Sequence, residues 1–428
     1  MKKSFNIIIG TIIFLLVGLR LTFLINAPLI GDEKEFLLVA NSISFNPVQF
    51  NLPLEHPLIH HPLLSVYTLK VGISIFSETK LGIRFFSLVS GLMTILLLFG
   101  FTKRTLGRPY ALTAVILLGL NRFHIGISGL GVDDALLLFL SSLSIFLFWR
   151  ALTNQRACYI AIAGVSAGLA YLTKESAILL LGCYVIYLIL TPKYRDWFKQ
   201  SKFYILLCSF LCTISVYIIW MLKHGTSQRL IQDKLWSNLG IGPSGLGFFL
   251  IELTRYIKNI DFHALVSWEY PTMPWIMGLL LLVCSIITYF KYKTEIVRFM
   301  SLILGLFVLF TGILKQAEFY WAEISLIPAV YLSSISLVSA INKSVLLKKL
   351  AFVFCLVLSL TNFVFTLSAK QALPPDRFAN KVDYDTDLIE WLYLNGEVER
   401  GIAEAKQAQI ICPNEVRIKN LLKLLESK

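Results

Sequence analysis

The sequence contains little charge. Only 15% of its 428 residues are Asp, Glu, Lys or Arg, whereas 56% are hydrophobic, and the mean hydropathy is +0.72. Soluble domains carry about 25% charged residues, because their surfaces must be solvated. This composition therefore excludes a soluble globular protein and indicates a polytopic membrane protein.

Acidic residues are scarcer than basic ones, and the net charge is +13. Lys and Arg in short loops are retained on the cytoplasmic side of a membrane. Placing the N-terminus inside assigns to the cytoplasm Lys2, Lys3, Lys103, Arg104, Arg108, Arg150, Arg156, Lys193, Arg195, Lys199, Lys202, Lys291, Lys293, Arg298, Lys343, Lys348 and Lys349. Only two acids, Asp196 and Glu295, fall on that side. Because the whole basic excess lies on one side of the membrane, it gives no support to nucleic-acid binding.

The sequence also lacks a disulfide framework and a zinc-binding cysteine spacing. Six of its seven cysteines fall in or beside apolar runs, which predicts buried small side chains. The first apolar run lacks a convincing small-residue cleavage site as far as about Leu24, so we expect a retained signal-anchor helix.

Long apolar runs dominate what is present. A transmembrane helix needs about 20 mostly apolar residues. Reading for such runs predicts an all-α bundle of about eleven spans, N-terminus in and C-terminus out, near 5–26, 81–101, 109–122, 134–150, 157–173, 175–191, 203–222, 272–290, 299–314, 322–341 and 350–369. Residues 1–369 would form the membrane domain and 370–428 a soluble extracytoplasmic tail.

Three outer segments are long, 27–80, 223–271 and the tail, and we expect function there. The first contains an apolar stretch from Leu63 to Phe76 that is interrupted by Lys70, which predicts an interfacial or re-entrant helix. If this stretch were counted as a membrane span, the basic loop that follows the next span would lie on the outer side. The positive-inside rule excludes that arrangement.

The second long segment, 223–271, interleaves aromatic residues with Lys234, Arg255 and Lys258. One interpretation is an aromatic belt at the membrane surface. The other is a lid over a lipid-linked substrate whose phosphate needs cations. The two interpretations are compatible.

The tail is polar and periodic from Asp383 onward. Its pattern predicts helices over 385–394, 398–411 and 416–426, the first stopped by Gly396. The spacing of its small residues resembles the second half of one tetratricopeptide repeat. Because one repeat cannot bury a core alone, we expect the tail to dock on the enzyme's outer face or on a protein partner, or to form a loose hairpin.

Ionisable residues beside a membrane span are costly to desolvate and usually have a task. Asp32 and Glu33 follow the first apolar run, which makes their loop the first candidate active site. Arg84 opens the second span and Lys174 lies between two short spans. Either cation could bind phosphate or pair with a carboxylate, for which Glu78 and Glu175 are the nearby candidates. Asp134, with its neighbour Asp133, could cap the fourth span or line an acceptor cleft.

The histidines His60 and His61 lie in the same outer loop as Asp32. With Glu33, His60 is a weak candidate ligand for a divalent metal. Adjacent residues on a regular element point to different faces, however, and no further ligand is fixed by spacing. A structural or substrate-orienting role is therefore favoured, and the sequence requires no cofactor.

An ordered set of residues resembles the C-type glycosyltransferase superfamily, in the branch of protein O-mannosyltransferases and aminoarabinose transferases. The set runs through Arg20, Asp32-Glu33, His60-His61-Pro62-Leu63, Leu81 to Ser87, Asp134, Ala167 to Lys174, and Phe319-Tyr320 ahead of Ile327-Pro328. The sequence departs from the family pattern at Ser128-Gly129, where relatives often have an Arg, and at Leu63 in place of a second proline.

This resemblance implies an enzyme of the cytoplasmic (inner) membrane that transfers a sugar from a polyprenyl-phosphate donor, with inversion, at the extracytoplasmic face. The acceptor would be a lipid, a glycan or a protein. Asp32 would be the general base, and Glu33 would assist it or hold an ion. The residues that would contact substrate are His60, His61, Arg84, Asp134, Lys174 and Tyr320.

Two other classes of protein fit the same hydropathy. A transporter or flippase of lipid-linked sugars would also need many spans and buried charges, but transporters place ionisable groups near the bilayer midplane, whereas here they crowd the outer loops. A non-catalytic membrane scaffold would use the tail to recruit a partner, and it would tolerate the loss of Asp32.

Overall fold

The computed structural model describes residues 2–27, 29, 31–42, 62, 64–223, 275–313 and 323–367. In the tail it describes 386, 389–390, 392–393, 396, 398–411 and 416–427. Every regular element within these residues is helical, which confirms the all-α prediction. Asp32 is described only through its backbone, and the predicted site residues His60, His61 and Tyr320, like segment 224–274, lie outside the described residues.

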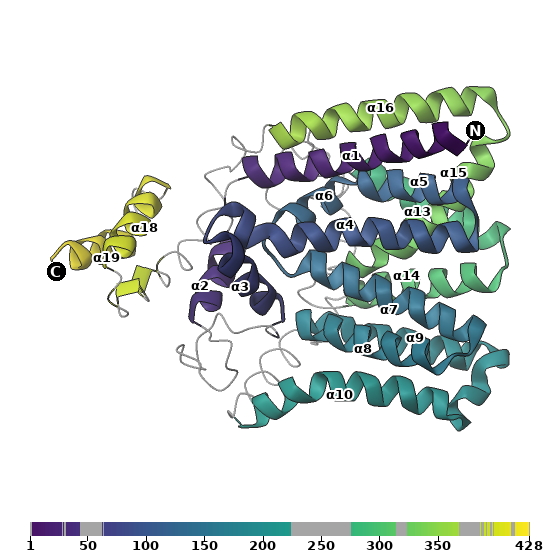
Figure 1. The fold of residues 1–428 in the computed structure, drawn as a ribbon, viewed down its shortest axis with the longest axis horizontal. Helices are drawn as coiled ribbons and strands as arrows, with labels where there is room; N and C mark the ends of the chain where they lie inside the picture. Colours follow the sequence, from purple (N-terminus) through teal and green to yellow (C-terminus); the bar gives the residue numbers. More distant parts are fainter. Residues whose placement is uncertain are drawn as a thin grey trace.

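Most helices run side by side in one bundle (Figure 1). Its members are α1 (Lys2–Asn26), α4 (Lys80–Thr105), α5 (Arg108–Gly119), α6 (Arg122–Gly129), α7 (Asp134–Asn154), α8 (Ala157–Thr173), α9 (Ile178–Leu190), α10 (Ser201–Lys223), α13 (Trp275–Lys291), α14 (Glu295–Ile313), α15 (Leu326–Ile341) and α16 (Val345–Leu367). The short helices η1 (Glu175–Ala177) and η2 (Pro192–Lys199) flank α9. Helix α8 packs between α7 and α10, and α1 packs on α16.

A helix lies at each predicted span, but not every helix is long enough to cross a membrane alone. Within the described residues, five helices are long and apolar enough to cross a membrane. They are Lys80–Thr105, Asp134–Asn154, Ser201–Ile219, Glu323–Ile341 and Val345–Val364. Two bent pairs raise the number to seven. The count of eleven spans therefore stays a prediction.

One predicted span contains a bend that the sequence analysis did not expect. Helices α5 and α6 meet at 64°, and the predicted span 109–122 ends at the first residue of α6. Asn121 caps α6, because its side-chain oxygen accepts a hydrogen bond from the backbone N–H of His124 at 3.2 Å. After the bend, α6 packs against α1 and α4.

The two ends of the bundle differ in charge. The basic end holds the start of α1 and the short connections after α4, α7, α9, α13 and α15, with the basic residues that were assigned to the cytoplasm (Figure 1). The opposite end, which we call the loop end, holds the end of α10 and the starts of α4, α7 and α15 (Figure 1). The basic connections therefore share one end of the bundle, and the orientation inferred from the positive-inside rule stays a prediction.

The first long loop contains two helices, α2 (Gly31–Ser42) and α3 (Leu64–Phe76), at the loop end. The prediction of a helix ending at Phe76 is confirmed. Helix α3 lies between α2 and α4 and approaches α4 closely, because a Cβ added at Gly72 would lie 2.2 Å from the carbonyl oxygen of Gly82. Helix α2 is held through Lys70, whose ammonium donates to the carbonyl of Ala40 at 2.8 Å.

The tail contains α18 (Val398–Ile411) and α19 (Val416–Glu426), at the predicted positions. Gly396 has a φ of +80°, the left-handed conformation predicted for a helix stop. The two helices enclose a small hydrophobic cluster in which Gly401 lies against Leu425. The kinship to a tetratricopeptide repeat stays a prediction.

Candidate active site at the loop end

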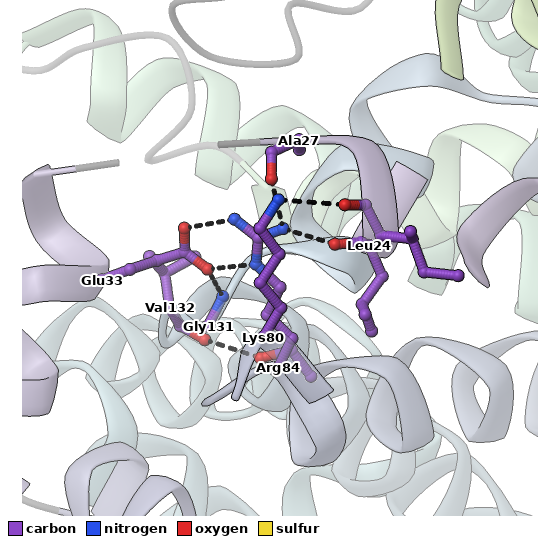
Figure 2. A network of polar contacts seen from close by, with 9 residues as sticks. Leu24, Ala27, Glu33, Lys80, Arg84, Gly131 and Val132 are labelled. Atoms are coloured by element: carbon purple, nitrogen blue, oxygen red, sulfur yellow. Dashed lines mark hydrogen bonds and ion pairs between the residues drawn. The ribbon is translucent and has the colours of Figure 1, made fainter. Parts of the chain in front are cut away.

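A buried ion pair joins α2 to α4. The guanidinium of Arg84 donates two hydrogen bonds to the carboxylate of Glu33, from Nε to Oε1 and from Nη2 to Oε2, both at 2.6 Å (Figure 2). Both side chains are fully excluded from solvent. This two-pronged geometry is the strongest arrangement available to an arginine and a carboxylate.

The remaining contacts of this pair reach two further segments (Figure 2). Arg84 Nη1 donates to the carbonyls of Leu24 at 2.7 Å and Ala27 at 3.0 Å, at the end of α1. Glu33 Oε1 accepts from the backbone N–H of Gly131 at 2.6 Å, in the loop before α7. Buried charges are tolerated when their hydrogen-bonding groups are satisfied in this way. The network therefore fixes the ends of α1 and α6 against the starts of α2 and α4.

A second buried charge cluster surrounds Lys174, at the end of α8. Its ammonium lies 2.7 Å from Asp134 Oδ1, 3.7 Å from Asp133 Oδ1 and 3.8 Å from Glu323 Oε1. Lys174, Asp134 and Glu323 are each less than 10% exposed. The cluster thus joins α8 to the starts of α7 and α15.

The carboxylates around Lys174 keep it charged. Burial by itself lowers the pKa of this lysine, but the charges of Asp133, Asp134 and Glu323 outweigh burial and raise its pKa well above the ordinary value. Because the pKa is raised, the ammonium stays protonated at neutral pH. Its contribution to stability is present below the pKa of an unfolded lysine and is lost only as the pH rises through the raised pKa.

One short loop connects the two clusters. Gly131 contacts Glu33, and Asp133 and Asp134 follow within three residues and contact Lys174. Ser87 of α4 holds the same loop by donating to the carbonyl of Val132 at 3.2 Å. The two clusters are therefore joined through this one loop.

A further buried pair lies deeper, between α1 and α6. Arg20 Nη2 lies 2.6 Å from Nδ1 of His124, and Arg20 Nη1 donates to the carbonyls of Leu16 at 3.0 Å and Gly119 at 3.2 Å. Both side chains are fully buried. This pair fixes α1 at the bend between α5 and α6.

The structure brings together four of the predicted site residues, Glu33, Arg84, Asp134 and Lys174. Their ion-pair partners differ from the expected ones. Arg84 pairs with Glu33 rather than Glu78, which instead accepts a hydrogen bond from Asn41 at 2.8 Å.

Sequence analysis missed Glu323 and gave His124 no role. Glu323, like Asp134, is an acid at the start of an apolar run, and His124 is a histidine inside one. These patterns are the signals that could have identified them.

The described residues do not favour a metal site. No group of three or more His, Cys, Asp or Glu among them is arranged to hold a metal ion. Both carboxylate oxygens of Glu33 face Arg84, and the three carboxylates near Lys174 surround an ammonium instead. A ligand set that includes His60 falls outside this part of the chain.

Replacing Lys174 by Met should destabilise the protein strongly, because the buried acidic groups of Asp133, Asp134 and Glu323 would lose the cation that lies among them. Adding Asp134→Asn should restore part of the loss by removing one uncompensated charge. Thermal unfolding of the purified protein in detergent measures both changes. Lys202→Met, which breaks an exposed hydrogen bond to Gln155, is the control and should change little. An equal loss in the single and double variants would contradict the charge balance described here.

Two comparisons of the sequence with known proteins found a match, one to a family model and one to a single relative. Residues 60–220, less than half of the chain, match the family model of dolichyl-phosphate-mannose-protein mannosyltransferase. An uncharacterized protein of Aquifex aeolicus is 24% identical over 207 residues, which are 48% of this chain and 40% of the relative. The chain thus spans less than half the length of this relative.

Solved membrane enzymes share the fold. ArnT from Cupriavidus metallidurans bound to undecaprenyl phosphate superposes with a TM-score of 0.60 at 14% identity, over 79% of this chain and 60% of that chain. The oligosaccharyltransferase AglB from Archaeoglobus fulgidus, in complex with an inhibitory peptide and a dolichol-phosphate, gives 0.54 at 12% identity, over 90% and 58%. Another structure of the Archaeoglobus fulgidus oligosaccharyltransferase holds Zn and sulfate. The predicted resemblance to the C-type glycosyltransferase superfamily is confirmed, and these identities establish the fold alone.

Proposed function

We propose that this protein is an inner-membrane glycosyltransferase that moves a sugar from a polyprenyl-phosphate donor to an acceptor at the loop end, on the extracytoplasmic face. The match to a mannosyltransferase family model and the fold shared with a protein bound to undecaprenyl phosphate support this proposal. The gathering of buried charges at the loop end, rather than at the bilayer midplane, favours an enzyme over a transporter.

The proposed reaction is a single displacement. A nucleophilic atom of the acceptor forms a bond to the anomeric carbon as the bond from that carbon to the phosphate oxygen breaks, which inverts the anomeric configuration. The acceptor proton passes to the carboxylate of Asp32, and polyprenyl phosphate leaves with the bonding electrons. A general base must lie within about 3 Å of the acceptor atom whose proton it takes.

The observation that carries this assignment is the network around Glu33. The backbone of Asp32 precedes Glu33 in α2, and Glu33 is fixed by Arg84 and the N–H of Gly131. A carboxylate base works only when its position is held against the substrate. We therefore assign Asp32 as the base and Glu33 and Arg84 as positioning residues.

The second cluster would line the acceptor side of the site. Asp134, held by Lys174, lies one short loop away from Glu33. Because Lys174 and Arg84 are both bound to carboxylates, we assign neither to the donor phosphate. The cations Lys234, Arg255 and Lys258 of segment 223–271, with His60, His61 and Tyr320, are the proposed donor contacts, and these residues lie outside the described part of the chain.

Reconstitution tests this proposal. The purified protein in proteoliposomes should release polyprenyl phosphate from polyprenyl-phosphate sugars only when an acceptor is supplied. The acceptor panel should hold a lipid, a glycan and a peptide with free hydroxyls, and mass spectrometry should detect the added sugar. Movement of the intact donor between leaflets without cleavage would instead indicate a flippase.

A further inference from the structure

A pocket opens at the basic end of the bundle, far from the candidate active site. It has a volume of about 280 Å³ and lies between α13, α15 and the start of α16. Its walls include Cys284, Ile287, Leu337, Ala340 and Leu347. The exposed apolar side chains on α13 and α16 beside it are typical of helix faces that contact lipid tails.

Two ammonium groups and two hydroxyl groups gather at the mouth of this pocket. Lys291 and Lys343 line it, from the end of α13 and the turn before α16. The hydroxyl of Tyr292 lies 2.7 Å from that of Ser339, another lining residue. Hydrogen bonding to Ser339, with the nearby charges of Lys291 and Lys343, lowers the pKa of Tyr292, so both ammonium groups act on the same hydroxyl.

The acid nearest in sequence does not neutralise these lysines. Glu295 is engaged by Lys193, at 3.0 Å, and by the hydroxyl of Tyr194, also at 3.0 Å. Helix α16 begins at Val345, next to Lys343, so the positive end of its dipole adds to the same corner. The mouth therefore presents positive charge and hydroxyl groups above an apolar groove.

We propose that this pocket binds an anionic phospholipid of the cytoplasmic leaflet, with its phosphate between Lys291 and Lys343 and one acyl chain in the groove between α13, α15 and α16. Basic pockets between helices on the cytoplasmic side are suited to anionic headgroups, and each lysine near such a surface contributes about 1 kcal/mol, or roughly a fivefold change in affinity. The site does not depend on the proposed reaction.

Topology alone would also place lysines at this end. It requires only their presence in the loops, however, and not a shared pocket with hydroxyl groups and an apolar groove. A measurement of lipid binding to the folded protein therefore distinguishes a lipid-binding pocket from lysines that are present only because of membrane topology.

The test titrates lipid onto the purified full-length protein in detergent and follows bound lipid by native mass spectrometry. Phosphatidylglycerol should bind roughly 25-fold more tightly than phosphatidylcholine, the product of one fivefold contribution from each of the two lysines. The double variant Lys291→Gln, Lys343→Gln should lose that preference, whereas Lys348→Gln, Lys349→Gln, on the neighbouring turn outside the pocket, should keep it.

Two more arms identify the part of the lipid that is recognised. Ala340→Phe, which fills the groove without altering charge, should weaken phosphatidylglycerol binding, and glycerol phosphate without acyl chains should not compete. Equal binding of the two lipids by the wild-type protein would overturn the proposal. So would competition by free glycerol phosphate at matched concentration, or an equal loss of preference in both lysine double variants.

Discussion

The change of Asp32 to Asn should reduce sugar transfer by about 100- to 10,000-fold, the range expected when a general base is removed. Asparagine keeps the size of the side chain but cannot take a proton from the acceptor. The start of α2 should stay in place, because Glu33 and Arg84 still hold it. We therefore expect turnover to fall while donor binding changes little, as measured by initial rates over a range of donor concentrations in proteoliposomes.

Asp196→Asn provides the matched control for this change. Asp196 is exposed in η2 at the basic end, so the same chemical replacement there should leave transfer unchanged. If Asp32→Asn retains turnover within about twofold of the wild type, Asp32 is not the base. The scaffold alternative would then regain support, because a scaffold does not need this carboxylate.

Much of the fold could be predicted because its signals are local. Apolar runs indicated where the bundle helices lie, and capping residues such as Gly396 indicated the helices of the tail. The bend between α5 and α6 was not predicted because Asn121, Arg122 and His124 interrupt the apolar run, so the predicted span ended at 122 and left α6 outside it. The cap at Asn121 was present in the sequence, but hydrophobicity alone does not distinguish a straight span from a broken one.

The candidate site was predictable in its members but not in its pairings. Glu33, Arg84, Asp134 and Lys174 could be chosen because charged groups beside spans are costly. Their partners could not, because Glu33 and Arg84 are 51 residues apart and Lys174 meets Glu323 across several intervening helices. Sequence proximity favoured Glu78 and Glu175, and the tertiary packing brought other carboxylates closer.

Removing one side of the pair between Glu33 and Arg84 should have the largest effect on stability. Breaking a buried ion pair by deleting one partner leaves an uncompensated charge and costs about 3–5 kcal/mol. Both Arg84→Met and Glu33→Gln should therefore reduce the yield and the thermal stability of the protein in detergent. The matched control is Lys193→Met, which breaks the exposed pair with Glu295 at 3.0 Å and should change thermal stability little.

The double change Glu33→Gln, Arg84→Met should be less harmful than the sum of the single changes, because it leaves neither buried charge alone. Some loss should remain, since the carbonyls of Leu24 and Ala27 would still lack their donor. A loss equal to the sum of the single changes would contradict direct coupling between the two side chains.

Exchanging the charges, with Arg at 33 and Glu at 84, should not restore stability. A carboxylate at position 84 would face the carbonyl oxygens of Leu24 and Ala27, and a guanidinium at position 33 would face the N–H of Gly131. Each new charge would thus meet backbone dipoles of the wrong sign. Recovery of wild-type thermal stability by the exchanged pair would mean that mutual attraction alone holds α2 to α4. If the exchanged pair stays unstable while the neutral double variant partly recovers thermal stability, these backbone contacts determine which position must carry the acid and which the base.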